Sequence, residues 1–526
     1  MKVDKNADKY YEAEARELKG IHIHGTFKRV FCPPDREPIT CRWTYDIKRD
    51  DQGKIVLFKA RLVVHGFKQR EGVDFHKTFS STAQIRTFRF VTAVAFELGL
   101  AATQYDISNA FLNGPIDADI YMKHPPGYPS KEAGTCFKLL KGLYGLKQAS
   151  RIWQQTLYSA LGELGLEVCK TESGVLHTTT PSGKRCWMLC WVDDLIIYTD
   201  DEAYRKRLVD HLMSKFIVKS LGKLAHYVGI VVKTGDGPDG KFTTMDQAPY
   251  NRRSVHKFLG PDPKESSVPG NPNARLSKLD SPYTDEEREK IDYPYMSATG
   301  TLLYTALCTR PDIFFSVAQL CRFNSDPGEK HVQASKQVFQ YLARTGEQGI
   351  RFTKTPDFDG KIRIIGYVDS DWGGCVDTRR STAGYVIHVA NGPVSWVSKL
   401  MKTMALSSCE AEFMGMSQIC REIMWMCRFL DEIGVPYHTP EIHCDSASAL
   451  TWSEDPVQHQ RNKHVEIKYY YVRDCVANGS VIAIKVCTTF NFSDIMTKCV
   501  GKQINDRLVP SALGHLGPRL HERKAR

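Results

Sequence analysis

The fold is decided by the stretch Cys186–Thr199, which reads CWMLCWVDDLIIYT. Two short apolar runs, rich in β-branched and aromatic residues, flank the adjacent carboxylates Asp193 and Asp194, a pattern that predicts two buried strands joined as a hairpin. Two like charges at the tip of an apolar hairpin are costly unless something compensates them. Divalent cations are the usual compensation, although a solvated Asp-Asp turn is the simpler interpretation of this stretch taken alone.

A third carboxylate and two basic side chains precede this hairpin. A helix is predicted over 84–98, followed by a strand from residue 104 that places Asp106 near its end. Residues 39–65 read as a pair of strands, and Lys59 and Arg61 stand two apart on the second, so they share one face. An ordinary surface pair and a clamp for phosphate groups both remain open for these two cations.

Composition narrows the classes of protein that the chain can represent. Its 526 residues suggest three or four compact units, and no apolar run approaches the roughly 18 residues needed to cross a bilayer. The charged N-terminus lacks the apolar core of a signal peptide, and the 16 cysteines form no Cys-x-x-Cys pairs, which favours a reducing, intracellular setting. The net charge of +11 permits a polyanionic partner without requiring one.

The second half of the chain divides into a connector, a helical segment and another globular unit. Gly, Pro, Asp and Ser dominate 234–295, which predicts a flexible connector around a short helix at 248–259. Residues 295–345 are predicted to be helical, with a break at 310–312. From about residue 361, strands alternate with a long helix at about 408–430, which predicts an α/β unit, and 501–526 reads as a loose basic tail.

Four motifs in fixed order resemble the reverse transcriptases of copia-type LTR retrotransposons. They are KARLV at 59–63, YDISNAFLNG at 105–114, LYGLKQA at 143–149 and VDD at 192–194. TRPDI at 309–313 resembles the connector of that family, and 361–500 resembles its RNase H. The resemblance implies an α+β right-hand polymerase joined to an α/β RNase H-like domain. The implied limits are 1–24 for an N-terminal extension, 25–240 for fingers and palm, 241–360 for thumb and connection, 361–500 for RNase H and 501–526 for the tail.

The resemblance assigns polymerase roles by position. It implies that Asp106, Asp193 and Asp194 hold two metal ions with help from the Ile107 carbonyl. It further implies that Lys59 and Arg61 contact the incoming triphosphate, that Gln148 lies beside the nucleotide and that Phe111 lies beneath its sugar. The chain departs from the family at Trp191, where tyrosine is usual, and this puts full polymerase activity in doubt.

Four further carboxylates are selected by the resemblance to RNase H: Asp369, Glu412, Asp445 and Asp494. Between the two neighbouring glutamates, Ser407 and Glu410 form a capping-box pattern, so Glu410 is expected at the helix N-terminus and Glu412 is left for the site. Asp371 is expected to be a solvated neighbour. For His464, a substrate contact and an ordinary surface histidine both remain open.

These residues predict a bifunctional enzyme that copies RNA into DNA and cleaves the RNA of the resulting hybrid. Each site is expected to use two Mg²⁺ or Mn²⁺ ions. The expected partners are an RNA template, a DNA primer, the RNA–DNA hybrid and dNTPs, with Gag particle and integrase as further candidates, no membrane, and a cytoplasmic particle or the nucleus as location. The absence of protease and integrase motifs suggests the C-terminal part of a Pol polyprotein or a truncated copy. An inactive or domesticated nucleic-acid-binding remnant is the alternative.

Overall fold

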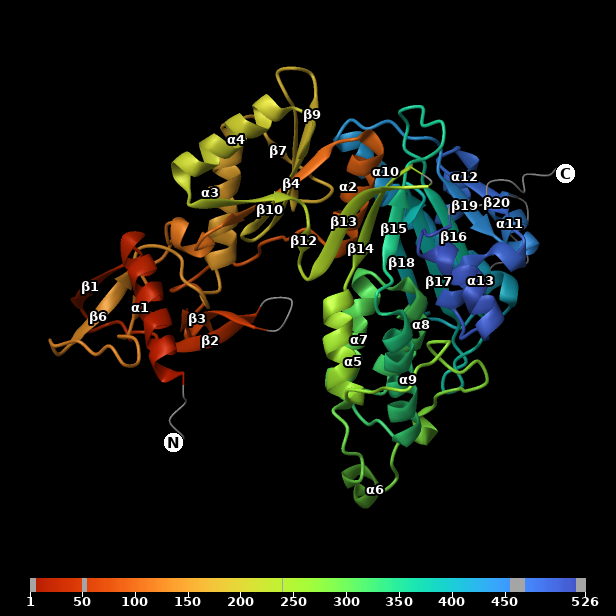
Figure 1. The fold of residues 1–526 in the computed structure, drawn as a ribbon, viewed down its shortest axis with the longest axis horizontal. Helices are drawn as coiled ribbons and strands as arrows, with labels where there is room; N and C mark the ends of the chain where they lie inside the picture. Colours follow the sequence, from red (N-terminus) through yellow and green to blue (C-terminus); the bar gives the residue numbers. More distant parts are fainter. Residues whose placement is uncertain (1–5, 50–53, 239, 455–468, 517–526) are drawn as a thin grey trace. The chain divides into compact units, whose positions relative to one another are not determined.

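The structure is a computed structural model that describes residues 6–49, 54–238, 240–454 and 469–516 (Figure 1). The chain forms two compact units, and each of them is assembled from two separate stretches. Unit 1 contains Met1–Ala83 and Ala102–Lys223, and unit 2 contains Gln84–Ala101 and Leu224–Arg526. The domain limits given above remain predictions. Among the described residues, no helix is long and apolar enough to cross a membrane.

A six-stranded sheet in the order β11-β4-β10-β9-β8-β7 forms the centre of unit 1. Its core includes apolar side chains of β9, β10 and the two helices α3 and α4. In the Asp-Asp hairpin, residues 186–190 and 195–199 are all buried. The predicted hairpin is therefore confirmed. The elements are β4 (Ala101–Ile107), β7 (Glu167–Val168), β8 (Val175–Thr179), β9 (Arg185–Trp191), β10 (Asp194–Thr199), β11 (Val218–Lys223), α3 (Ala149–Gly162) and α4 (Glu202–Lys215).

The rest of unit 1 consists of a long hairpin, a small sheet and an N-terminal helix. Strands β2 (Cys41–Arg49) and β3 (Ile55–Val64) pair antiparallel, as predicted for 39–65. Ala13 of helix α1 (Ala7–Ile23) is buried with Phe58 and Ala60 of β3, which fixes α1 against that strand. The small sheet contains β1 (Phe27–Phe31), β6 (Thr135–Leu139) and β5 (Tyr121–Met122) in that order.

The first part of unit 2 combines a four-stranded sheet, in the order β12-β13-β14-β15, with a helical bundle. Helices α5, α7 and α9 run side by side within it (Figure 1). The helix predicted at 248–259 and the break at 310–312 are confirmed. The elements are α2 (Ile85–Leu98), β12 (His226–Tyr227), β13 (Ile230–Gly237), β14 (Gly240–Asp246), α5 (Ala248–Leu259), α6 (Asp285–Glu289), α7 (Tyr295–Cys308), α8 (Phe314–Cys321), α9 (Glu329–Thr345) and β15 (Ile350–Thr353).

The flexible connector predicted from residue 234 is wrong in its first part. Residues 234–237 belong to β13 and residues 240–246 to β14, and Gly237 pairs with Gly240 where the two strands of this hairpin meet its turn. Gly240 has a φ of +91°, which glycine adopts without steric cost. The same composition therefore marks a tight turn between strands rather than a linker.

The second part of unit 2 is a five-stranded sheet in the order β18-β17-β16-β19-β20. Strands β16, β17 and β18 pair antiparallel, whereas β19 and β20 join the edge of β16 in parallel. The predicted combination of α+β and α/β architectures is confirmed. The elements are β16 (Ile365–Ser370), β17 (Thr382–Val389), β18 (Gly392–Leu400), α10 (Ser408–Glu432), β19 (Glu441–Cys444), α11 (Ala447–Glu454), α12 (Tyr471–Ala477), β20 (Ile482–Lys485) and α13 (Lys502–Ala512).

Helix α13 corrects the expectation of a loose tail beyond residue 501. Its side chains Leu508, Val509 and Ala512 are buried, as is Leu513 directly after it. These positions recur at helical spacing, so one face of α13 is apolar although the segment is basic overall. The basic residues that suggested a solvated tail therefore occupy the opposite face and the sequence beyond it.

A histidine buried in the five-stranded sheet of unit 2 predicts that the protein loses stability in acid. His388 on β17 is 1% exposed and its ring stacks on Phe492 with 4.9 Å between centroids, and burial lowers its pKa to about 3. The unfolded chain therefore binds this proton at a higher pH than the folded chain does. Burial of the neutral ring therefore leaves the free energy of unfolding unaffected by this proton above about pH 6.5. As the pH falls from 6.5 toward 3, the free energy of unfolding decreases by about 1.4 kcal/mol per pH unit.

We expect His388→Leu to reduce the loss of stability between pH 7.5 and 5 by about 2 kcal/mol relative to the wild type. The measurement is urea unfolding at the two pH values, with His256→Leu as the matched control, because His256 is exposed on α5. Equal acid sensitivity of His388→Leu and the wild type would contradict the burial of a neutral ring.

Candidate active sites

The Asp-Asp turn is fixed to the end of β4 by backbone geometry. Only Val192 and Asp193 lie between the paired residues Trp191 and Asp194, and Val192 is held at a φ of +54°, a strained conformation for a β-branched residue. The Trp153 indole Nε1 donates to the Val192 carbonyl at 2.7 Å, and the Ile107 N–H donates to the Asp193 carbonyl at 2.9 Å. These bonds hold the turn beside Asp106.

The three carboxylates act on one another electrostatically. Burial, together with the negative charges of Asp193 and Asp106, raises the pKa of Asp194 to about 6. Burial likewise raises the pKa of Asp193, whereas Lys59 and Arg61 oppose that rise. The structure thus places the predicted carboxylates near the predicted cations Lys59 and Arg61.

Strand β3 contributes the basic residues of this site. Lys59 and Arg61 are half-buried on one face of the strand, with Ala60 buried on the other. Burial lowers the pKa of Lys59, and the like charges of Arg61 and Lys48 add to this effect. A nearby anion, such as a phosphate group, would stabilise the charged form of this lysine.

Phe111 contacts Tyr144, which in turn contacts the basic strand. It follows β4 through a turn at Asn109, whose φ is +53°, and its ring meets the edge of Tyr144 with 5.2 Å between centroids. Tyr144 in turn lies under the Arg61 guanidinium at 5.5 Å, and Asp193 raises the pKa of its hydroxyl in addition to burial. Tyr144 was not singled out from the sequence, although it stands in the LYGLKQA motif.

The LYGLKQA loop docks closely on β3. The Val64 N–H donates to the Tyr144 carbonyl at 2.8 Å, and a Cβ on Gly145 would lie 2.1 Å from the Val64 carbonyl oxygen. Gln148, at the start of α3, is fully buried, and its amide donates to the Asp74 carbonyl at 2.8 Å and accepts from Gln69 at 2.9 Å. Its predicted place beside the nucleotide stays a prediction.

Glu17 of α1 is a member of this site that sequence reasoning missed. One of its carboxylate oxygens is buried without a hydrogen-bond partner, and burial raises its pKa while Lys59 and Arg61 lower it. Glu17 therefore lies beside the cations where phosphate groups are expected. No signal marked it, because a glutamate in a helical extension rich in Lys and Glu is typical of a solvated face.

The second carboxylate cluster forms at strand ends in unit 2. Asp369 is the penultimate residue of β16, Asp445 follows β19, Glu412 lies on α10, and Asp494 lies in a short 3-10 helix, Phe492–Met496. Carboxylate oxygens of Asp369, Asp445 and Asp494 lie within 4.8 Å of one another, and Glu412 lies equally close to Asp445. The structure thus brings all four predicted residues together.

The close packing of this cluster disfavours four negative charges. Burial raises the pKa of Glu412 to about 9, and the charges of Asp369 and Asp445 contribute. Burial also raises the pKa of Asp494 to about 6, with Asp369 as the second cause. The Oε2 atom of Glu412 is buried without a hydrogen-bond partner, so the cluster holds an oxygen that none of the described residues satisfies.

Hard divalent cations fit both carboxylate groups. Carboxylate oxygens are the ligands that Mg²⁺ and Mn²⁺ prefer, and in the unit 2 cluster they are crowded and include a buried oxygen without a hydrogen-bond partner. Within the described residues, the mutual spacing of 4.8 Å is found for the unit 2 cluster and not for Asp106, Asp193 and Asp194. The unit 2 cluster is therefore the more closely assembled of the two.

The capping-box prediction separates the two glutamates correctly. The Ser407 hydroxyl accepts from the Glu410 N–H at 3.1 Å, and the Glu410 carboxylate accepts from the Leu406 N–H at 2.7 Å. Glu410 is thus committed to the start of α10. Glu412 faces β16, where a Cβ on Gly415 would lie 2.4 Å from the Ser370 hydroxyl, so the helix lies close to the strand.

Asp371 is not the solvated neighbour that was expected. Its carboxylate accepts a hydrogen bond from the Thr382 N–H, which fixes the beginning of β17. Burial, together with the charge of Asp369, raises its pKa to about 6. The segment Asp369-Ser370-Asp371-Trp372 does not reveal this contact in the sequence, because the bond is made to the beginning of another strand.

Thr497 and Lys498 are two further members of the unit 2 site. The Thr497 hydroxyl donates to Asp369, and the Lys498 Nζ lies 3.1 Å from Asp494 and 3.8 Å from Asp369. Both stand in the segment SDIMTK that was used to select Asp494, so the motif could have identified them. His464, for which two roles were left open, lies outside the described residues.

Comparison with known proteins identifies a family for the first half of the chain. Residues 24–269 match the family described as "Reverse transcriptase (RNA-dependent DNA polymerase)". Over 93% of its length the chain is 34% identical to the retrovirus-related Pol polyprotein from transposon TNT 1-94 of Nicotiana tabacum. The chain carries a reverse transcriptase domain of the copia type. The same share of the chain is 33% identical to the Pol polyprotein from transposon RE1 of Arabidopsis thaliana.

The chain spans about a third of the length of those curated relatives, 36% and 33% respectively. Among solved structures, a foamy viral protease-reverse transcriptase in complex with double-stranded DNA covers 91% of the chain and is itself covered to 70%. Its TM-score is 0.46 at 10% sequence identity.

Proposed function

We propose that the chain synthesises DNA on an RNA template and cleaves the RNA strand of the hybrid at a second site. The observation that carries this proposal is the presence of two separate carboxylate clusters, one in each compact unit, both built at strand ends. Only the first lies in the segment that matches the reverse transcriptase family. Under this proposal RNA, a DNA primer, dNTPs and the hybrid are the partners.

In the polymerase site, Asp106, Asp193 and Asp194 would hold two Mg²⁺ or Mn²⁺ ions, with the Ile107 carbonyl as a further ligand. When bound, such ions favour the attacking hydroxyl and stabilise the leaving oxygen in phosphoryl transfer. Lys59 and Arg61 then neutralise triphosphate oxygens that approach along β3. The negative charge of Glu17 would compete with the phosphate groups for these two cations.

In the second site, Asp369, Glu412, Asp445 and Asp494 would hold the ions. Lys498 contacts Asp494 and Asp369 directly, so its ammonium group neutralises part of the cluster and stands beside the phosphodiester to be cut. Thr497 orients Asp369 through its hydroxyl. The cleavage site is thus shaped by side chains from β16, α10, the end of β19 and the 497–498 segment.

The alternative is an inactive remnant that binds nucleic acid without catalysis. Trp191, which pairs with Asp194 across the turn, is the feature that favours it, because tryptophan lacks the acceptor oxygen of the usual tyrosine. The seven carboxylates that the two sites require are all present in the chain, which favours catalysis.

Incorporation of labelled dTTP on poly(rA)·oligo(dT) by the purified full chain tests the proposal. We expect Mg²⁺-dependent synthesis that EDTA stops, and metal-dependent cleavage of a labelled RNA–DNA hybrid in a parallel reaction. Hybrid binding with neither activity would support the inactive remnant instead.

Phe111 is expected to select deoxyribonucleotides. A flat ring held against Tyr144 and five residues beyond Asp106 is placed to overlap a 2′-hydroxyl and leave a 2′-hydrogen untouched. We expect Phe111→Val to raise the use of CTP relative to dCTP about tenfold or more, which is about 1.4 kcal/mol of discrimination. The measurement is the ratio of kcat/KM for the two nucleotides on one primed RNA template.

An ordinary core phenylalanine would behave differently. Its truncation to valine lowers stability and reduces the use of both nucleotides alike. An unchanged dCTP-to-CTP ratio in Phe111→Val would therefore remove Phe111 from the nucleotide site.

A further inference from the structure

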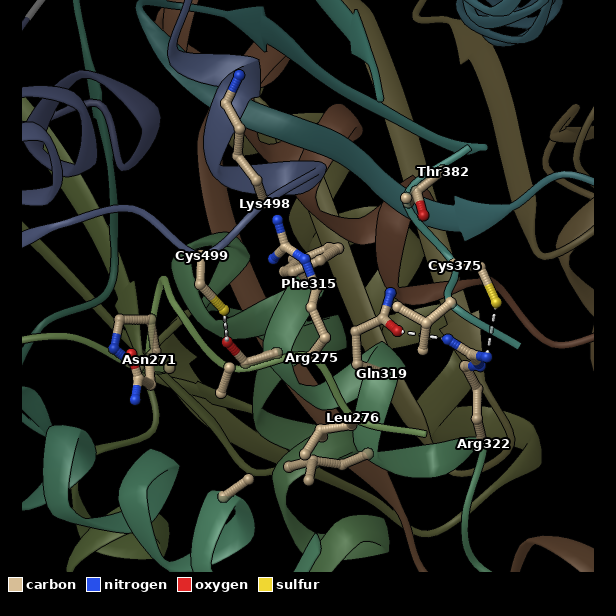
Figure 2. Close-up of a pocket in the computed structure, with 18 of the residues that line it drawn as sticks. Asn271, Arg275, Leu276, Phe315, Gln319, Arg322, Cys375, Thr382, Lys498 and Cys499 are labelled. Carbon is tan, nitrogen blue, oxygen red and sulfur yellow. Dashed lines mark hydrogen bonds between the residues drawn. The ribbon is translucent and has the colours of Figure 1, made fainter. Parts of the chain in front are cut away.

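Unit 2 contains a cavity of about 760 Å³ next to the second carboxylate cluster (Figure 2). Its walls come from the connector segment 269–276, helices α8 and α9, the loop 371–376 after β16, and residues 497–499. Thr497 and Lys498, which contact Asp369 and Asp494, form part of the wall. The cavity therefore opens beside the site where the hybrid is proposed to be cut.

One cation of this cavity is left without a direct carboxylate partner. Arg322 pairs with Asp377 at 3.1 Å, Lys330 pairs with Asp280, and Lys498 pairs with Asp494 at 3.1 Å. Among the described residues, no carboxylate lies within ion-pair distance of Arg275, although Asp371 is near enough to feel its charge. In Figure 2 its side chain points toward the segment that carries Lys498.

The same cavity presents an aromatic face and amide groups. Trp372 is 58% exposed, and its indole Nε1 donates to the Ala405 carbonyl at 3.0 Å, which fixes the ring while leaving its face open. Leu276 and Phe315 add apolar surface, and Asn271 and Gln337 add amide groups. Aromatic faces stack on nucleobases, amides bond their edges, and an arginine fork binds phosphate.

We propose that this cavity binds one unpaired nucleotide of a strand that continues into the unit 2 site. Its phosphate lies on Arg275 and its base lies against Trp372. The volume suits a ligand of nucleotide size and is too small for a duplex. This inference rests on the proposed hybrid cleavage, and it adds a specificity: substrates with a single-stranded extension are preferred to blunt hybrids.

The binding test uses the full chain and a hybrid whose RNA extension carries 2-aminopurine, without divalent metal so that no cleavage occurs. Extensions at the 5′ and at the 3′ end are compared. Stacking on Trp372 quenches 2-aminopurine, so we expect quenching with the wild type for one of the two ends. Trp372→Leu and Arg275→Met should lose it, Trp372→Tyr should retain part of it, and the control Arg253→Met, an exposed arginine on α5, should retain all of it.

The cleavage test compares kcat/KM for extended and blunt hybrids. We expect the wild type and Arg253→Met to prefer the extended hybrid about tenfold, since stacking and phosphate contacts of this kind are worth about that much, and the ratio to fall toward one in Trp372→Leu and Arg275→Met. Equal quenching in all variants, or an equal cleavage ratio in all variants, would overturn the proposal. A wild type that quenches but cuts no hybrid would retain the nucleotide site and contradict only the cleavage function.

Discussion

Asp193→Asn is expected to abolish DNA synthesis while hybrid cleavage continues. Asp193 lies at the tip of the Asp-Asp turn beside Asp106, within unit 1, and no residue of the second cluster belongs to that unit. Replacing one carboxylate removes a ligand charge but keeps the shape of the turn. A loss of about 4 kcal/mol of transition-state stabilisation corresponds to a rate reduced by roughly 10³-fold.

The reciprocal substitution is Asp445→Asn, which should remove hybrid cleavage and leave synthesis intact. Asp445 is the residue common to both close groupings of unit 2 acids, so its loss affects ligands on either side. Matched controls are Asp210→Asn in unit 1 and Asp262→Asn in unit 2, because both aspartates are exposed. Loss of both activities from either single substitution, in folded protein, would show that the two clusters serve one reaction.

Asp312→Ala is expected to cost about 3–5 kcal/mol of stability in unit 2. Asp312 and Arg310 are both fully buried side chains in the TRPDI motif. They form a bidentate ion pair, with hydrogen bonds of 2.8 and 2.6 Å from the guanidinium to the carboxylate. Arg310 also donates to the Thr345 carbonyl at 2.7 Å, and the Tyr341 hydroxyl donates to Asp312 at 2.9 Å. Removing Asp312 leaves a guanidinium charge in the core without its partner.

Hydrogen exchange of the α9 amides measures this effect, because α9 carries both Tyr341 and Thr345. The control is Asp285→Ala, which breaks the exposed ion pair with Arg288 and should cost less than about 1 kcal/mol. Replacing both partners by apolar residues, as in Arg310→Met with Asp312→Leu, should recover part of the loss. Similar exchange in Asp312→Ala and Asp285→Ala would contradict a dominant role for the buried pair.

The elements that were predictable are those with a strong local pattern. The β9–β10 hairpin follows from two apolar runs around two aspartates, and the start of α10 follows from Ser407 and Glu410. In the same way, the strand positions of Lys59 and Arg61 fix their common face. Each of these depends on spacing along one element, which the sequence displays directly.

The features that were missed depend on what another part of the chain supplies. Asp371 is fixed by a strand that begins eleven residues later, and Glu17 is placed by the packing of α1 on β3. Likewise, the Gly-rich run at the β13–β14 turn and the apolar face of α13 were assigned from composition. Composition predicts whether a segment is exposed to solvent, but it does not show which other helix or strand packs against that segment.

Two separate metal centres are tested most directly by anomalous X-ray scattering from Mn²⁺ in crystals of the chain with hybrid and dNTP. The predicted result is one set of peaks among Asp106, Asp193 and Asp194, and another among Asp369, Glu412, Asp445 and Asp494. Peaks confined to one cluster, or Mn²⁺ bound only at other residues while hybrid and dNTP are in place, would contradict the proposal that both clusters are catalytic.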